Sequence, residues 1–187
     1  MLSDLAKQVS SALVSAISGA DDVLIALRTA FKNQITGTLR DVADIATSSL
    51  DAVSDVVSGA VSAASSAGIS LVDAARDSVG ETVDAVSETG GNVLTAVSKA
   101  VSGAVKGASS VGGDVAKVAV SAVEGAVEHA GKVGVSTTEA AREAVVAVVK
   151  AADEVGGEVG KSVRDALLSA ASLPRDVIDS VLKGSGK

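Results

Sequence analysis

Valine and alanine recur along most of this chain at the spacing of an amphipathic α-helix. Over residues 93–110 the valines form one flank of a helical wheel, and alanine and glycine form the other. The valines are Val93, Val97, Val101 and Val105, and the small residues are Ala96, Ala100, Gly103 and Ala104. The apolar arc covers about half of the circumference, much more than a two-helix seam. This pattern predicts an all-α protein whose helices touch two neighbours and face an apolar region, or lie on lipid.

The helical pattern repeats with a unit of about 22 residues. Residues 68–79 match residues 134–145, residues 90–93 match 112–115, and residues 101–106 match 145–150. These offsets are about 66, 22 and 44, all multiples of 11. The units begin near Gly68, Gly90, Gly112, Gly134 and Gly156, and a degenerate copy begins near Ala46.

The glycines at the unit boundaries have two interpretations. Each can be the glycine that ends a helix, because a capping residue follows at Ser70, Asn92, Asp114 or Ser136, and the units are then short antiparallel helices. Alternatively, the preserved multiple of 11 (a hendecad repeat) keeps helical phase, which a loop does not need. We favour the second interpretation. It predicts long, nearly continuous helices with a right-handed supercoil, assembled as an oligomeric coiled-coil tube or bundle.

The two ends of the chain depart from the repeat. Residues 1–45 are richer in large apolar side chains and are expected to form a helical head, with Leu24, Leu27, Phe31 and Ile35 as the main oligomer contact. Residues 46–89 are expected to connect this head to a stalk of repeat helices over residues 90–173. Residues 174–187 predict a short amphipathic helix and tail, whose apolar face is the best candidate for membrane contact: Val177, Ile178, Val181 and Leu182.

The composition argues against an ordinary isolated globule. Of the 187 residues, 47% are hydrophobic but only 1% are aromatic, and large side chains normally supply most of the buried area of a core. A mean hydropathy of +0.43 also disfavours a solvated, disordered chain. Both observations favour an extended or oligomeric structure.

The net charge and the length of the longest uncharged stretch limit the classes of partner that we expect. The formal net charge is −7, and an acidic chain without clustered basic residues or stacking aromatics is a poor binder of nucleic acid. The longest uncharged stretch, residues 56–72, holds five serines and is short for a membrane span. The first residues lack the basic region of a secretory signal. We therefore expect a cytoplasmic protein, with peripheral contact to the inner face of the cell membrane.

The residues give little support to catalysis. His129 is the only histidine, no cysteine is present, and Glu124 and Glu128 precede that histidine by about one turn. A structural or surface histidine is the favoured interpretation over a metal ligand. No serine has a histidine and an acid arranged for nucleophilic attack, and the glycine pairs do not form a phosphate-binding loop. We expect no enzymatic activity and no cofactor held covalently or by metal ligation.

Three known families share parts of this pattern. The period of 11 resembles that of synuclein-like and perilipin-like lipid-surface proteins, but their basic KTKEGV-type core is absent. The Ala-rich amphipathic helices resemble those of phasins, which usually carry aromatics. The head of larger residues (about residues 1–80) and the Val/Ala/Gly arc over residues 90–163 resemble the stalk subunit of the mycobacterial high-affinity uptake [NiFe] hydrogenase. That resemblance implies a scaffold for enzyme protomers with a tubular region for menaquinone transfer.

The sequence therefore predicts a non-enzymatic, homo-oligomeric stalk that gathers enzyme subunits, such as those of a hydrogenase. Its repeats are expected to enclose an apolar channel for a lipophilic carrier such as menaquinone. The residues expected to line this channel are Val97, Val101, Val105, Val123, Val145 and Val149. The alternative is an amphipathic coat protein of lipid droplets or granules, similar to phasins or perilipins.

Overall fold

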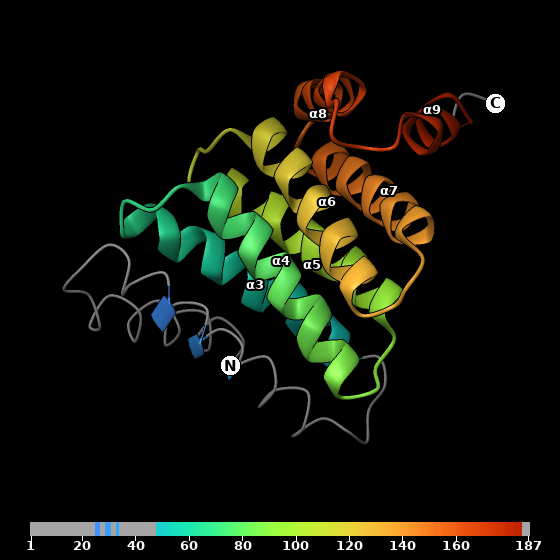
Figure 1. Ribbon diagram of the computed structural model, residues 1–187. Helices are drawn as coiled ribbons and strands as arrows, with labels where there is room; N and C mark the ends of the chain where they lie inside the picture. The colour runs from blue at the N-terminus through green and yellow to red at the C-terminus, as the bar shows by residue number, and fades with distance from the viewer. Residues whose placement is uncertain (1–24, 27–28, 31–32, 34–47, 185–187) are drawn as a thin grey trace.

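The computed structural model describes residues 25–26, 29–30, 33 and 48–184, and these residues form helices, turns and short connecting segments without a β-strand. The expected all-α class is thus confirmed for the described part of the chain. Over residues 48–184 the helices follow one another closely (Figure 1). They are α3 (Ser48–Ser66), α4 (Leu71–Glu88), α5 (Val93–Ser110), α6 (Val115–Lys132), α7 (Thr137–Val155), α8 (Gly157–Ser169) and α9 (Arg175–Gly184).

Four turns of the same design separate α3 from α4, α4 from α5, α5 from α6 and α6 from α7. Each has a glycine with positive φ, between 68° and 81°, at Gly68, Gly90, Gly112 and Gly134. In the turn after α4, the Gly91 N–H donates to the Val86 carbonyl at 2.9 Å and the Gly90 N–H donates to the Ser87 carbonyl at 3.1 Å. This pair of hydrogen bonds is the Schellman motif, which needs a left-handed residue that glycine adopts without steric cost.

The residue two positions after each of these glycines caps the next helix. Asn92 accepts a hydrogen bond from the Thr95 N–H at 3.0 Å, and Asp114 accepts one from the Lys117 N–H at 3.1 Å. Ser70 and Ser136 make the same kind of bond at the starts of α4 and α7. The expectation of long, nearly continuous helices is therefore wrong. The interpretation as short helices ended by glycine is correct at these four boundaries.

The fifth expected boundary, Gly156, has a different structure. Its backbone is extended, with φ 165° and ψ 149°, and α8 starts at the next residue without a side-chain cap. The chain therefore bends sharply between α7 and α8 instead of passing through a four-residue turn. The regular array ends at α7, and the shorter helices α8 and α9 follow it.

The helices stack in two layers in which each helix packs against the next but one. One layer contains α3, α5 and α7, the other contains α4, α6 and α8, and successive helices also contact one another across the layers (Figure 1). Neighbours within a layer run parallel, since contacts between α4 and α6 join Val72 to Ser121 and Asp84 to His129. Two consecutive helices thus form one structural repeat of 44 residues, as in helical solenoids. This stacking explains the preserved spacing, because helices of equal length must stay in register with their neighbours.

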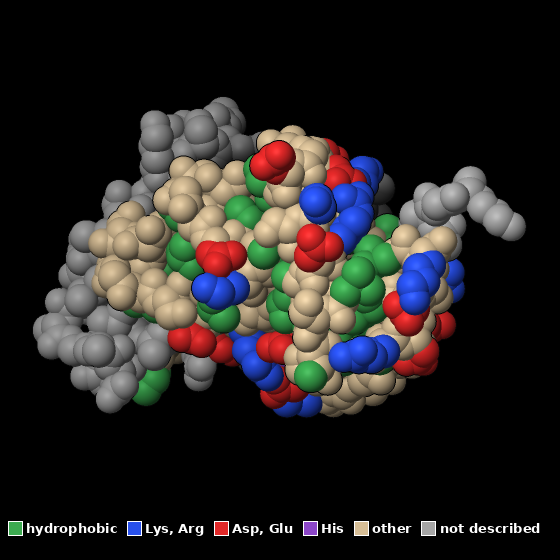
Figure 2. Space-filling view, turned by 90° about the horizontal axis from the view of Figure 1, so that it is seen from above, with side chains coloured by type: hydrophobic (Ala, Val, Ile, Leu, Met, Phe, Trp, Pro, Cys, Tyr) green, Lys and Arg blue, Asp and Glu red, His purple; other side chains and the backbone are tan. Residues whose placement is uncertain are grey.

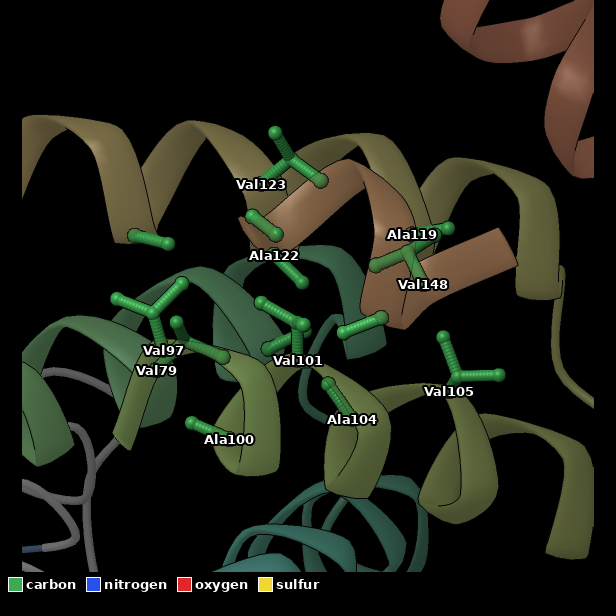
Figure 3. Close-up of a cluster of buried hydrophobic side chains, with 14 of the residues drawn as sticks. Val79, Val97, Ala100, Val101, Ala104, Val105, Ala119, Ala122, Val123 and Val148 are labelled. Atoms are coloured by element: carbon green, nitrogen blue, oxygen red, sulfur yellow. The ribbon is translucent and has the colours of Figure 1, made fainter. Parts of the chain in front are cut away.

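The core lies between the two layers and is built mainly from valine and alanine. One valine recurs every 22 residues at the same helical position and is at most 1% exposed in each helix. These residues are Val57, Val79, Val101, Val123 and Val145. The side chains of α5 and α6 point towards one another in this region, with Val148 of α7 beside them (Figure 3). The expectation that Ala and Val could not form a core within one chain is wrong, because the helix backbones lie close enough for small side chains to fill the space.

Glycine and serine make this close approach possible within each layer. A Cβ atom on Gly103 of α5 would lie 3.0 Å from the Cα atom of Ser54 on α3, and closer still to its carbonyl oxygen. A Cβ on Gly107 would lie 2.7 Å from the Ser58 carbonyl oxygen, one turn further along. In the other layer, a Cβ on Gly125 of α6 would lie 2.5 Å from the Arg76 carbonyl oxygen of α4. At each of these glycines, therefore, the backbone of the neighbouring helix lies where a side chain of this helix would otherwise project.

We predict that Gly103→Ala destabilises the protein by about 1–3 kcal/mol, although alanine favours a helix by about 1 kcal/mol. The added methyl group meets backbone atoms of α3, which no side-chain rotation can move away. The same change at Gly157, the exposed first residue of α8, meets nothing within 4 Å and should be neutral or stabilising. Chemical denaturation of both variants measures the difference, and equal effects would contradict the close contact.

Candidate functional site

Five of the six valines expected to line a channel lie in the interior of the single chain. Val97, Val101 and Val105 of α5, Val123 of α6 and Val145 of α7 are buried in the core, and Val149 is half-buried and packs against it. Figure 3 shows the α5 valines pointing into space that α6 and α7 fill with Ala119, Ala122 and Val148. The five buried valines do not face an open lumen here, because the turns fold the chain back and its own apolar arcs cover one another.

The sequence predicts two further sets of contact residues, one in the N-terminal head and one on the C-terminal helix. Leu24, Leu27, Phe31 and Ile35 lie outside the described residues, so the oligomer contact of the head stays a prediction. In α9, Val177 and Ile178 are buried and Val181 and Leu182 are half-buried, because this helix packs on α7 and α8. The expectation that Val177 and Ile178 contact a membrane is therefore wrong for this conformation. Among the described helices, none combines the length and the apolar character that crossing a membrane requires.

The single histidine joins two neighbouring helices of one layer. The Nδ1 atom of His129 on α6 lies 2.8 Å from an Oδ2 atom of Asp84 on α4, and both side chains are partly buried. Gly80 provides the space for the ring, since a Cβ atom there would lie 2.5 Å from Nε2 of His129. His129 thus contributes to helix packing, in keeping with its interpretation as a structural histidine.

A charged network lies one to three turns away on the same pair of helices. Arg76 of α4 donates to Glu128 of α6 at 2.7 Å and to Glu124 at 3.3 Å, and Lys132 donates to Glu128 at 2.8 Å. Ser172, in the segment after α8, donates to Glu124. The hydrogen bond from Arg76, followed by that from Lys132, lowers the pKa of Glu128 from its ordinary 4.5 to about 2. The bond to Glu128 also raises the pKa of Arg76.

Sequence reasoning missed this network because its members are about 50 residues apart. The spacing of the repeat is a signal that could have revealed the network. Residues 44 positions apart occupy equivalent places on parallel neighbours, so a pair separated by 44 plus one or two turns faces across the layer. Arg76 and Glu124 are 48 residues apart, and Arg76 and Glu128 are 52 apart.

Helices α4 and α5 carry different charges at equivalent positions. On α4 acidic residues predominate, among them Asp77, Glu81 and Asp84, whereas α6 carries Glu124 and Glu128 together with Lys117 and Lys132. By contrast, α5 contains no acidic residue. A shallow groove of about 340 Å³ crosses its outer face between α3 and α7, and is lined partly by Lys99, Lys106 and Lys150. The two helices α4 and α5 therefore differ in charge, since α4 is mainly acidic and the charged residues of α5 are both lysines.

A second groove, of about 490 Å³, lies between α7 and α9. Its apolar lining consists of Val146 and Val149 of α7 and Val181 and Leu182 of α9. Its charged lining consists of Lys150, Asp153, Glu154 and Arg164. Figure 2 looks onto the side of the molecule that carries α8 and α9. In its right-hand part, hydrophobic side chains lie among basic and acidic ones. This groove therefore combines an apolar floor with a charged border.

Comparison with known proteins does not identify the chain. No family model matches it, and no curated protein matches it.

We predict that Glu128→Gln reduces the pH dependence of stability in acid. A carboxylate with a lowered pKa in the folded state stabilises it above the unfolded-state pKa, near 4.5 for glutamate, and this contribution is lost as pH falls from there towards about 2. The melting temperature of the variant should therefore fall less steeply than that of the wild type over this range. At neutral pH the loss should stay below about 1 kcal/mol, because the Glu128 side chain is 42% exposed and solvent screens the pair.

The matched control is Glu143→Gln, at an exposed carboxylate of α7 outside the network of Arg76, Glu124, Glu128 and Lys132. Its acid melting profile should follow that of the wild type. Identical profiles for the two variants would contradict a stabilising role for the Arg76–Glu128 pair.

Proposed function

We propose that this chain is a non-catalytic scaffold of helical repeats that presents its outer faces to other proteins. The observation that carries the proposal is the position of the apolar residues. In the regular array they are used for packing between and within the layers, while serine, lysine and acidic residues form long outer faces. Stacked helical repeats typically supply extended binding surfaces of this kind.

The side chains that could carry chemistry support the same proposal. His129 and Asp84 are engaged with each other between α4 and α6. Arg76, Glu124 and Glu128 connect the same two helices near the surface. These groups join helices, and their known contacts are sufficient to explain their positions. A hydrogenase as the partner rests on the sequence resemblance alone and is the narrowest form of the proposal.

A channel for a lipophilic carrier is not part of the proposal. Five of the six valines expected to line it are buried in the core of the chain, and Val149 is half-buried. A carrier could replace them only if the two layers separated, and this would expose the apolar arcs of every helix involved.

A lipid coat is the second candidate, and the composition of the core favours it. Apart from a few larger residues near the C-terminus, the core consists of valine and alanine, which bury little area each. If the layers opened, each helix would present an apolar arc covering about half of its circumference to a lipid surface.

Circular dichroism and light scattering, with and without phospholipid vesicles, should separate the two candidates. We expect the wild-type chain to be helical and to melt cooperatively without lipid, because its helices pack on one another. A chain that is disordered in buffer and becomes helical only on vesicles would overturn the scaffold and support the coat.

Two variants sharpen this test. Val101→Asp places a carboxylate in the core and should remove most of the helical signal in buffer, since a buried unpaired charge costs several kcal/mol. Lys106→Asp changes an exposed position of the same helix and should alter stability by no more than about 0.5 kcal/mol. In the coat alternative both variants are disordered without lipid, just like the wild type.

A further inference from the structure

The groove between α7 and α9 lies where the regular array ends. Within the layer of α3, α5 and α7, a stripe of small residues on each helix faces the next helix. On α3 this stripe contains Ser54 and Ser58, which face Gly103 and Gly107 of α5. At a spacing of 44 residues, the equivalent positions are Ser98 and Ser102 on α5, and Arg142 and Val146 on α7.

The next helix in the layer covers this stripe of α7 only in part. Its neighbour α9 has 10 residues, whereas the regular helices have 18 or 19. Val146 is consequently 47% exposed, and the groove opens beside it. The terminal units of repeat proteins normally carry a polar outer face for solubility. Here the last unit becomes apolar at one of the two stripe positions, because Val146 replaces the serine of the interior units, while Arg142 replaces the other serine.

The charges that border the groove are balanced. Lys150 and Arg164 are basic, and Asp153 and Glu154 are acidic. Arg164 pairs with Asp153 within the chain at 2.5 Å, while Lys150 and Glu154, one turn apart on α7, have no ion-pair partner among the described residues. A neutral border gives no net attraction to an anionic lipid surface. The border is complementary to the same border of a second copy. In a copy turned by a twofold rotation, Lys150 and Glu154 appear in the opposite order.

We propose that this groove is the contact surface between two copies of the chain, related by a twofold axis. Val146 and Leu182 of each copy lie against the apolar floor of the other, and Lys150 of each copy lies opposite Glu154 of the other. A twofold contact uses the same surface on both copies and closes on itself, so it joins two arrays end to end without forming a fibre. This inference rests on the proposed function, because it names the first partner of the scaffold.

Light scattering on the full chain over a range of concentrations tests the contact. The wild type should dimerise, and Val146→Glu should weaken the dimer at least about tenfold, since it places a charge in the centre of the apolar contact. Val111→Glu is the matched control. Val111 is also an exposed valine but lies in the turn after α5, so its dimer should match that of the wild type. Circular dichroism checks that both variants keep their helices.

Charge exchange tests the pairing itself. Lys150→Glu and Glu154→Lys should each weaken the dimer, because each brings like charges together twice across the axis. Mixing the two single variants should restore a dimer, since Glu at position 150 then faces Lys at position 154 and the remaining pair is also complementary. A structural role within one chain would not produce this rescue between chains.

Three outcomes would overturn the proposal: a wild-type chain that stays monomeric at about 100 μM, a dimer that Val146→Glu leaves unchanged, or single charge variants that do not recover on mixing. The second outcome would place the contact elsewhere, for example at the predicted head. None of them bears on whether the chain is helical without lipid, so failure of this contact and failure of the scaffold are distinguishable.

Discussion

Close contact between parallel helices within a layer is the constraint on which the rest of this structure depends. Valine and alanine can form a dry core only if helix backbones lie near one another, because their side chains reach a short distance. Gly103 and Gly107 permit that approach against Ser54 and Ser58 of α3, and Gly125 permits it against Arg76 of α4. Without these positions the helices within each layer would stand apart, and small side chains would leave gaps between them.

The same contact imposes a fixed unit length. Helices that pack on the next but one must be equally long and start at equivalent points, or the glycines would miss the backbones opposite them. A helix of 18 residues and a turn of four, ended by Gly90 and restarted by Asn92, meets this requirement, and the turns at Gly68, Gly112 and Gly134 repeat it. The charged pairs follow from the register as well, since Arg76 meets Glu124 and Glu128, and Asp84 meets His129, across the same seam.

Most apolar side chains of the helical array are buried inside it, and this determines which surfaces remain for contact with partners. The outer face of α4 is acidic, α6 carries charges of both signs, and α5 carries lysine and serine, so contacts there are polar. At the C-terminal end, the short helix α9 leaves Val146 and part of the α7 stripe uncovered. The helical array therefore differs in chemistry between its sides and its C-terminal end, and the end carries the partly exposed apolar residues.

The sequence by itself determined the helical class and the spacing of 22 residues, and it identified the residues that could end and cap the helices at four boundaries. These features depend on local periodicity and on the backbone preferences of glycine, serine, asparagine and aspartate. The sequence did not determine whether the units join into long helices or fold back. A multiple of 11 keeps phase in a continuous helix, and the same spacing keeps separate helices in register. Only the tertiary structure decided between long helices and helices that fold back. It also decided that Val101 and Val123 lie in the core and that residues 45 to 52 positions apart form pairs. The physical reason is that these outcomes depend on how closely one helix backbone can approach another. The role of Gly103, for example, is evident only from its contact with the backbone of Ser54.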